Sequence, residues 1–350
     1  MNAGRIIILI ILMVLLAITW VFFIPGKYDV QALVERKGTE YWELSTGSRI
    51  GYYKVESTSG DASSPIIYLH GGPGGMIKDE IIEVLKPLSE LGHDVYFYDQ
   101  IGSGHSVRLD HIREYTVARH VADLKEIIEK INSEKVIIIG HSWGCLLAIN
   151  FIQHHPEKVE KIILEGPGPV LPVNQTLMSE VPPDSLNLRK PERSNEEGNR
   201  KAYNLRMRLI QKWAYLFKSK LASDREVDDF FTVLNEELSK STFCKSEQAK
   251  KYKGGSGYYS HIMTVRSFKE VEDKREKLGG IHIPVLILRG QCDNQKWGFA
   301  KEYLDLLPNS HLVIIENTGH DLATGNKDRY YELIEDFISP PARTKGYSRL

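Results

Sequence analysis

The sequence is poor in cysteine and in net charge, and each shortage excludes a class of protein. Its 350 residues include only three cysteines, Cys145, Cys244 and Cys292, which form no CxxC pair and no even-numbered framework. They suggest neither a zinc site nor a disulfide scaffold, so we interpret all three as packing residues. The 45 Lys and Arg residues balance 46 Asp and Glu residues without forming a basic stripe. A nucleic acid is therefore not expected as a partner.

A long apolar run near the N-terminus extends from Ile6 to Ile24. As a helix, at about 1.5 Å per residue, a run of this length spans the hydrocarbon core of a bilayer. It ends in Trp20-Val21-Phe22-Phe23-Ile24-Pro25, where a signal peptidase requires small residues. It also has no polar face with which a soluble core helix would meet water. The run therefore predicts an uncleaved transmembrane anchor over residues 1–26, with membrane contact through residues 6–24.

The charges that flank this run give no clear orientation, because Arg5 precedes it and Lys27, Arg36 and Lys37 follow it. A short leading tail before a long trailing domain is typical of exported signal anchors. We therefore expect the larger part of the chain to lie outside the cytoplasm.

After a linker, apolar segments of strand length alternate with segments of helical spacing. An antiparallel lead-in (40–45 and 49–56) is expected first, and then strands over residues 65–69, 95–98, 136–139, 161–164, 284–288 and 312–315. Helices are expected over residues 79–91, 117–131, directly after Ser142, and over 299–307 and 329–338. This alternation predicts an α/β fold, with a mostly parallel sheet covered by helices on both faces.

The alternation stops between about residues 171 and 281, where the sequence is polar and helical. Two amphipathic stretches occupy residues 205–217 and 227–238, and Ser223 is a good N-cap for the second. A helical insertion between two strands of one sheet predicts a cap over the carboxyl edge of that sheet. The predicted organisation is an anchor (1–26), a core in two parts (27–170 and 282–350) and a helical cap (171–281).

The pentapeptide Gly140-His141-Ser142-Trp143-Gly144 follows the predicted strand 136–139 and opens a helix. This is the G-x-S-x-G nucleophile elbow of α/β-hydrolases, in the strand–turn–helix context that the motif requires. The turn is so tight that side chains at both glycine positions would collide with neighbouring backbone. It lifts the hydroxyl of Ser142 above the sheet edge, which makes Ser142 the candidate nucleophile.

A serine hydroxyl needs a base to remove its proton, and the base needs an acid to orient it. In this fold the acid and then the histidine follow the serine along the chain. Asp293 and His320 follow the predicted strands 284–288 and 312–315, at the same sheet edge as Ser142. They are the candidate acid and base of a catalytic triad.

Two other residues compete for these roles. Glu165 ends a strand at the same edge and is the alternative acid, ranked behind Asp293. His141 is adjacent to Ser142 in the chain, but we expect the elbow to turn it away from the site.

A glycine-rich segment, His70-Gly71-Gly72-Pro73-Gly74-Gly75, follows the predicted strand 65–69. The tetrahedral intermediate of acyl transfer carries negative charge on the former carbonyl oxygen, which preorganised N–H groups stabilise. We expect one donor to be the N–H of Trp143, directly after the serine. The other is the N–H of Gly72, because glycine lets the main chain approach a substrate closely.

The segment Asp99-Gln100-Ile101-Gly102-Ser103-Gly104-His105-Ser106 follows the predicted strand 95–98. No Lys follows its glycines, so it does not match a Walker phosphate-binding loop. We expect it to buttress the oxyanion region. The chemistry that these motifs indicate requires no metal or organic cofactor.

In combination, these three motifs resemble the proline iminopeptidase family of α/β-hydrolases, from about residue 41 to 338 without most of the cap. The resemblance implies a serine hydrolase that removes an N-terminal residue, often proline, from small peptides or amides through an acyl-enzyme. The site residues that it implies are the triad Ser142, Asp293 and His320 and the oxyanion donors Gly72 and Trp143.

The sequence departs from the family pattern in two places. Ile101 occupies the third position of the loop after strand 95–98, where proline-specific relatives often carry Arg. Family members hold the ammonium of the substrate with cap carboxylates, which do not align here. The run 254–259 either lines the pocket or forms a flexible cap loop. The candidates for the amine anchor are Glu165 and the cap residues Glu180, Asp184, Glu236 and Glu237.

Two other functions fit the sequence less closely. A membrane-associated carboxylesterase or lipase would use the same triad on an ester or lipid. A catalytically silent binding protein would not need an intact triad with oxyanion glycines. We therefore expect a membrane-anchored serine aminopeptidase or amidase acting on small peptides or amides.

Overall fold

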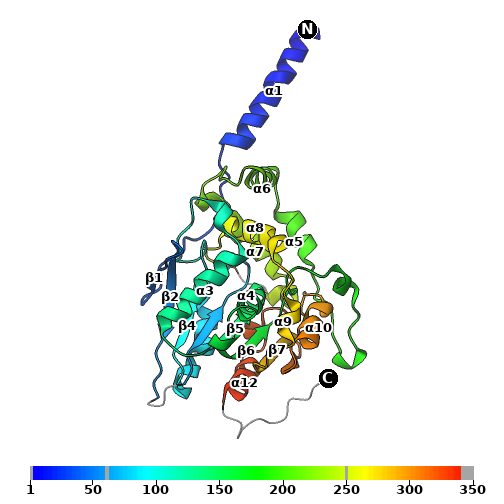
Figure 1. Cartoon of the computed structure of the whole chain (residues 1–350). Helices are drawn as coiled ribbons and strands as arrows, with labels where there is room; N and C mark the ends of the chain where they lie inside the picture. Colours follow the sequence, from blue (N-terminus) through cyan, green and yellow to red (C-terminus); the bar gives the residue numbers. More distant parts are fainter. Residues whose placement is uncertain (1–2, 60–62, 249–250, 340–350) are drawn as a thin grey trace.

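The computed structural model describes residues 3–59, 63–248 and 251–339, built around one eight-stranded sheet (Figure 1). The ends of the predicted anchor and core, residues 1–2 and 340–350, lie outside the described residues. The strands are β1 (Glu40–Glu43), β2 (Arg49–Val55), β3 (Ile66–Leu69), β4 (Val95–Tyr98), β5 (Val136–His141), β6 (Val159–Glu165), β7 (Val285–Gly290) and β8 (Ser310–Ile315). Their order is β1-β2-β4-β3-β5-β6-β7-β8. β2 pairs antiparallel with β1 and β4, and the six strands from β3 to β8 are parallel to one another. This mostly parallel sheet confirms the predicted α/β fold class.

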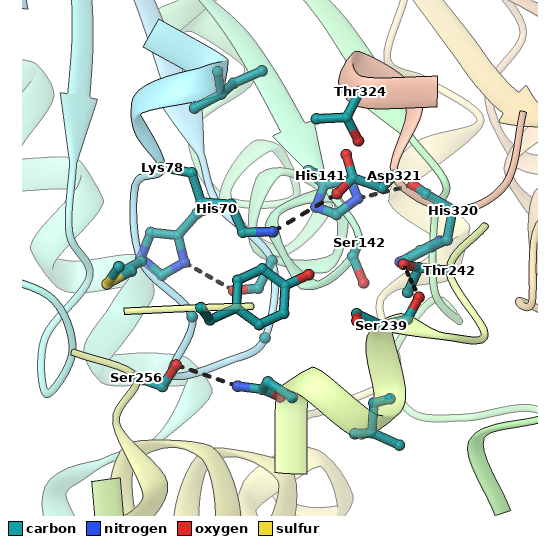
Figure 2. Close-up of a pocket in the computed structure, with 18 of the residues that line it drawn as sticks. His70, Lys78, His141, Ser142, Ser239, Thr242, Ser256, His320, Asp321 and Thr324 are labelled. Atoms are coloured by element: carbon teal, nitrogen blue, oxygen red, sulfur yellow. Dashed lines mark hydrogen bonds and ion pairs between the residues drawn. The ribbon is translucent and has the colours of Figure 1, made fainter. Parts of the chain in front are cut away.

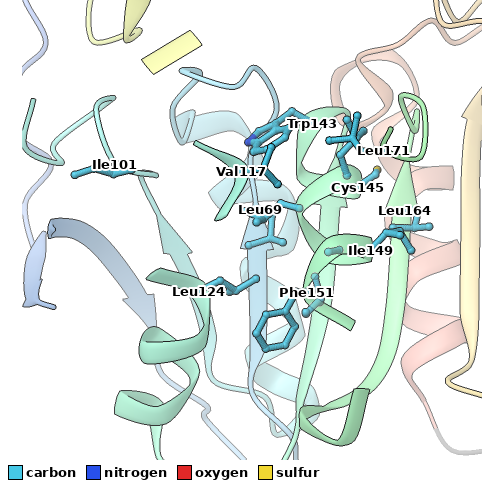
Figure 3. Close-up of a cluster of buried hydrophobic side chains, with 14 of the residues drawn as sticks. Leu69, Ile101, Val117, Leu124, Trp143, Cys145, Ile149, Phe151, Leu164 and Leu171 are labelled. Carbon is cyan, nitrogen blue, oxygen red and sulfur yellow. The ribbon is translucent and has the colours of Figure 1, made fainter. Parts of the chain in front are cut away.

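Helices cover both faces of this sheet. The α-helices that lie outside the segment between β6 and β7 are α1 (Ala3–Phe23), α2 (Asp79–Leu85), α3 (Val117–Ile131), α4 (Trp143–Ile152), α10 (Trp297–Leu306), α11 (Leu322–Gly325) and α12 (Lys327–Ile338). Of these, α1 does not cover the sheet. Side chains of α3, α4 and α10 pack in one hydrophobic core, part of which is drawn in Figure 3. Side chains of α2 and α12 pack in the second core. Both faces of the sheet are thereby kept from water.

The central strands read as continuous apolar runs because both of their faces are buried. Successive side chains of a strand point to opposite faces. Ile67 and Ile138 accordingly belong to the core of α3 and α4, and Ile66 and Ile137 to the core of α2 and α12.

One predicted helix, over residues 79–91, is divided. The α-helix α2 ends at Leu85, and residues Lys86–Leu91 form a 3₁₀ helix instead. Pro87 is the cause, because its ring cannot donate a backbone hydrogen bond and clashes with the preceding turn of an α-helix.

The insertion between β6 and β7 is helical, and we call residues 171–281 the cap segment. Its α-helices are α5 (Asn195–Ala202), α6 (Leu205–Phe217), α7 (Asp224–Ser239), α8 (Tyr258–Ser267) and α9 (Arg275–Leu278). Ser223 caps α7 as predicted, since its side chain accepts a hydrogen bond from the N–H of Glu226. The cap segment and the loops at the carboxyl ends of the strands together enclose a cavity.

The helix α1 projects from the rest of the molecule (Figure 1). It has 21 residues, or about 32 Å of helix, and none of its segment Ala3–Trp20 is buried. Within the described residues, it is the helix that is long and apolar enough to cross a membrane. Length and composition alone also fit a signal sequence.

Deleting residues 1–26 is expected to convert a detergent-requiring protein into one recovered in the aqueous phase with unchanged catalytic activity. The reason is that α1 contributes no residue to either hydrophobic core. Detergent phase partitioning of the two proteins measures the change, and a chain lacking only residues 1–4 is the control. Recovery of the full-length, uncleaved chain in the aqueous phase would contradict the predicted anchor.

Candidate active site

Ser142 lies in the turn between β5 and α4 and faces the cavity (Figure 2). Its backbone has φ 53° and ψ −112°, a conformation that is costly for a residue with a side chain. A Cβ on Gly140 would lie 2.7 Å from the carbonyl oxygen of Gly144, and one on Gly144 would lie 2.1 Å from that of Leu69. Only glycine fits at either position, which agrees with the crowding of the turn expected from the sequence.

His320 and Asp293 are in direct contact beside this elbow. His320 Nδ1 lies 2.9 Å from Asp293 Oδ1, and both side chains are buried. A carboxylate only accepts hydrogen bonds, so Nδ1 donates and Nε2 of the neutral imidazole is left as an acceptor. Gly166, directly after β6, makes room for the pair, because a Cβ there would lie 2.7 Å from His320 Nδ1. Ser142 and His320 line one cavity, and both are drawn in Figure 2.

The charge of Asp293 is held by its surroundings. Its Oδ1 also accepts a hydrogen bond from the N–H of Gln295, and Arg289 Nη1 lies 3.8 Å from its Oδ2. Burial alone would raise the pKa of Asp293, but His320 and then Arg289 outweigh it and lower the pKa to about 2. The carboxylate is therefore ionised throughout the neutral range, as an acid that orients a histidine must be.

The glycine-rich loop after β3 passes directly beside the elbow. A Cβ on Gly71 would lie 3.1 Å from the Cβ of Ser142. Gly72 has φ 130°, and a Cβ there would lie 2.5 Å from the backbone nitrogen of Gly75. The main chain can take this path only with glycine. The roles of Gly72 and Trp143 as oxyanion donors remain predictions.

The loop after β4 connects the elbow to the glycine-rich loop. The side-chain nitrogen of Gln100 donates to the carbonyl oxygen of His70 at 2.9 Å. Its side-chain oxygen accepts the indole N–H of Trp143 at 2.7 Å. A Cβ on Gly104 would lie 2.0 Å from the carboxyl carbon of Asp99, so the loop closes tightly on its own aspartate. These contacts are those of the buttress that the sequence predicted.

The cavity over Ser142 has a volume of about 410 Å³. Its floor comes from the elbow, from the glycine-rich loop and the residues that follow it, from Glu165 at the end of β6, and from the segments after β7 and β8. Its roof comes from the cap segment, which contributes Asn195, Asn199, Tyr203, Phe231, Leu234, Asn235, Leu238, Ser239, Thr242, Tyr252, Lys253, Ser256 and His261. The space suits a substrate of a few residues or fewer.

Residues 64–323 match the family described as alpha/beta hydrolase fold. The chain belongs to the α/β-hydrolase family. Its relatives include proteins named proline iminopeptidase. The one from Saccharolobus solfataricus is 26% identical and aligns over 82% of this chain and 88% of its own length. The one from Lactobacillus delbrueckii subsp. bulgaricus is 26% identical over 84% of this chain and 96% of its own. These relatives confirm the resemblance that the three motifs predicted.

Solved structures share the fold of this α/β-hydrolase. An alpha/beta fold family hydrolase from Bacillus anthracis has a TM-score of 0.58 and 20% identity, over 86% of this chain and 99% of that one. An esterase from Exiguobacterium antarcticum has a TM-score of 0.55 and 18% identity, over 84% and 97%. At these identities the likeness concerns the fold.

Glu165, the alternative acid of this α/β-hydrolase, has a different partner. Its Oε1 accepts a hydrogen bond from the hydroxyl of Tyr330 at 2.5 Å, whereas His320 contacts Asp293. Burial raises the pKa of Glu165 to about 8, although the bond from Tyr330 opposes the rise, and Asp321 adds to it. At neutral pH Glu165 is therefore a carboxylic acid in the cavity wall, next to the elbow.

The raised pKa of Glu165 predicts a loss of stability with rising pH. Between its ordinary value of 4.5 and about 8, the unfolded state releases a proton that the folded state keeps. This contribution to stability is complete below pH 4.5 and is lost by about pH 8. Glu165→Gln does not ionise, so its unfolding temperature relative to wild type should rise from pH 5 to 8 and then level off.

The control for this measurement is Glu237→Gln. Burial opposes a fall in the pKa of Glu237, but Lys240 and Lys201 outweigh it and lower this pKa below its ordinary value of 4.5. The charge of Glu237 therefore changes little between pH 5 and 8. The unfolding temperature of Glu237→Gln should therefore keep a constant offset from wild type between pH 5 and 8. A constant offset for Glu165→Gln as well would show that Glu165 is ionised in the folded protein.

The predicted cap carboxylates lie away from the cavity. Among the described residues that line it, the acidic ones are Glu80, Glu165 and Asp321, all from the core. Of the four cap candidates, Glu236 accepts a hydrogen bond from the N–H of Tyr252 and Glu237 pairs with Lys201 and Lys240. Glu180 and Asp184 lie on an exposed part of the cap segment. Of the candidate anchors, Glu165 alone is among the lining residues.

The prediction that the elbow turns His141 away from the site is wrong. Its ring lines the cavity, with the ring centroid 4.9 Å from that of His320 (Figure 2). Its Nε2 donates to the carbonyl oxygen of His320 at 3.1 Å. Burial, and then the neighbouring His320, lower the pKa of His141 to about 4, so the ring is neutral. The elbow turns only the Ser142 side chain upward, and the loop after β8 folds over His141.

The interpretation of the cysteines is also wrong in part. Cys244 and Cys292 form a disulfide with their Cα atoms 5.2 Å apart, while Cys145 is free and buried. The bridge joins Cys244 of the cap segment to Cys292, which directly precedes Asp293. The two cysteines are 48 positions apart and lie on either side of the end of the cap segment, so no local sequence pattern predicts the disulfide.

The run 254–259 is hydrogen-bonded to the glycine-rich loop after β3 and to the loop after β4. Gly257 N donates to the carbonyl oxygen of Gly74 at 2.7 Å, and Gly104 N donates to that of Gly255 at 2.7 Å. Ser256, between them, lines the cavity. Of the two interpretations left open, the pocket-lining one is confirmed for Ser256.

Several residues of the site had no sequence signal. Gly166 and Arg289 surround the His320–Asp293 pair, and Lys78 lies 3.7 Å from Asp321 at the cavity wall (Figure 2). Within the described residues, no group of three or more His, Cys, Asp or Glu residues is placed to hold a metal ion.

Proposed function

We propose that this α/β-hydrolase is a serine hydrolase with Ser142 as nucleophile, His320 as base and Asp293 as the orienting acid. The observation that carries the proposal is the buried His320–Asp293 contact of 2.9 Å beside the elbow of Ser142. A histidine held through Nδ1 offers its Nε2 to a serine hydroxyl, which is the arrangement that makes the hydroxyl nucleophilic.

The reaction then runs in two halves. Ser142 Oγ attacks the carbonyl carbon of the substrate while His320 Nε2 takes the hydroxyl proton. The oxyanion that forms is stabilised by the N–H groups of Gly72 and Trp143. His320 returns the proton to the leaving amine or alcohol, which leaves an acyl-enzyme. A water molecule repeats the attack, and His320 protonates Ser142 as the acid is released.

The substrate that we propose is a small peptide or amide, from which the enzyme releases the N-terminal residue. Support comes from the three sequence motifs and from relatives named proline iminopeptidase that align over most of both chains. A cavity of about 410 Å³ under the cap segment also favours short substrates. The substrate amine would meet carboxyl groups of the core, of which Glu165 is nearest to the elbow in sequence and structure.

A carboxylester is the second candidate substrate, and one observation favours it. The cap segment gives the described cavity wall aromatic, aliphatic, amide and hydroxyl groups, with Lys253 and His261, but no carboxylate. An ammonium group would find no charged partner in that roof, whereas an uncharged acyl chain would pack against Phe231, Leu234 and Leu238. Both candidates use the same triad, so only the substrate distinguishes them.

Free-amine aminoacyl amides are expected to exceed their N-acetyl versions in kcat/KM by at least about tenfold, equivalent to about 1.4 kcal/mol. A charge-assisted hydrogen bond from a substrate ammonium is worth about 1.5–3 kcal/mol, and an acetyl group removes it. Prolyl amides belong in the panel, with butyryl aryl esters beside them. The Ser142→Ala protein serves as the control for contaminating hydrolases. Equal rates on free and blocked amides, with faster turnover of the esters, would establish the second candidate.

We further propose that α1 is a single-pass anchor and that the hydrolase lies outside the cytoplasm. The disulfide between Cys244 and Cys292 supports this side of the membrane, because disulfides persist in oxidising compartments and are rare in the cytosol.

A further inference from the structure

Helix α6 of the cap segment has two apolar faces, and only one of them is buried. The inner face packs in the core through Met207, Ile210 and Ala214. The outer face carries Leu205, Leu216 and Phe217, whose exposed fractions are 69%, 75% and 59%. Trp213 lies beside Phe217, with their ring centroids 4.3 Å apart. A helix on the surface of a soluble protein normally needs only the inner stripe.

The charges of this helix have one sign. Residues 205–220 contain no Asp or Glu, and their basic residues are Arg206, Arg208, Lys212, Lys218 and Lys220. Arg206 and Lys220 pair with acidic residues of α7, at Glu226 and Asp224. Exposed Leu, Phe and Trp side chains together with Lys and Arg are typical of helices that lie in the interface of a bilayer.

The position of α6 is fixed next to the end of α1 (Figure 1). Arg206 Nη1 donates to the carbonyl oxygen of Phe22 at 3.2 Å. Gly26 N donates to Glu226 Oε1 at 2.7 Å, so the chain leaving α1 is attached to the start of α7. Because Phe22 belongs to the last turn of α1, the first turn of α6 lies at the depth where the apolar span ends.

We infer that the outer face of α6 lies in the interfacial region of the same phospholipid bilayer that α1 crosses. Leu205, Leu216 and Phe217 then contact acyl chains near the headgroups, and the exposed basic residues Arg208, Lys212 and Lys218 face lipid phosphates. The inference rests on α1 as an anchor and does not depend on the proposed catalysis. It gives the cap segment a second, peripheral attachment that holds the hydrolase in one orientation on the membrane.

The test uses the full chain in phospholipid nanodiscs, in which both bilayer faces are open to the solution. A fluorophore is attached to Leu216→Cys, and the native cysteines do not compete because Cys145 is buried and the other two are bridged. The matched control is Val181→Cys, at a residue with an exposed fraction of 80%. It lies two positions after Gln175–Ser179, a short segment that packs on α10, whereas α6 packs on α1.

Two quenchers report the environment of each label. At position 216 we expect loss of quenching by aqueous acrylamide, and quenching by brominated acyl chains, whereas position 181 should show the reverse. Leu205→Cys, at the other end of the outer face, should behave like position 216. Acrylamide quenching at 216 equal to that at 181 would overturn the inference. So would protection at 216 from both quenchers, which would indicate a covering protein, or failure of the chain to enter the discs, which would remove the anchor itself.

Discussion

Ser142→Ala is expected to lower kcat by about 10⁶-fold, the scale seen when the nucleophile of a serine hydrolase is removed. The variant lacks the oxygen that forms the acyl bond at the position that the strained turn gives to Ser142. Its backbone conformation, with φ 53°, is the part of the elbow that raises this one side chain above the sheet. Steady-state kinetics on the best substrate of the panel measure the loss.

The matched control is Ser256→Ala, which removes another hydroxyl from the wall of the same cavity. It should keep activity within an order of magnitude of wild type, and both variants should unfold at the wild-type temperature. Near-wild-type turnover by Ser142→Ala would show that another residue is the nucleophile.

Asp293→Asn is expected to lower kcat by about 10⁴-fold, as in serine proteases with the equivalent change. The carboxylate accepts the Nδ1–H of His320, whereas an amide can place its NH₂ group there and force the proton onto Nε2. The imidazole then cannot accept the proton of Ser142. The change also leaves Arg289, which is buried 3.8 Å from the carboxylate, without its counter-charge.

Glu165→Gln is the isosteric control for this experiment. It changes the same functional group on the same cavity, at a carboxyl that contacts Tyr330 and not His320. Its activity should fall far less than that of Asp293→Asn. A larger loss at Glu165 than at Asp293 would reverse the assignment of the acid.

The sequence sufficed for those parts of the molecule that depend on local patterns. The strands, the elbow at Ser142 and the loops that carry Asp293 and His320 are each encoded within about ten consecutive residues. Buried runs of β-branched residues, glycines at crowded positions and helical spacing can all be recognised one segment at a time.

The remaining features depend on contacts between distant segments. The bridge from Cys244 to Cys292 and the packing of His141 under the loop after β8 both need the folded chain. The cap carboxylates are the clearest case. Their residue type suggested a role in the cavity, but α7 turns Glu236 and Glu237 toward a main-chain N–H and two lysines, and Glu180 and Asp184 are exposed.

The disulfide next to Asp293 also restricts how the cavity can open. It holds one corner of the cap segment at a fixed distance from the catalytic loop, 5.2 Å between Cα atoms, whatever else moves. With the bridge intact, the cap segment cannot lift away from the sheet as a whole, because Cys244 stays beside Cys292. The largest displacements then fall on the parts of the cap farthest from Cys244. A widening of the cavity that keeps this bridge would leave the loop that carries Asp293 in place.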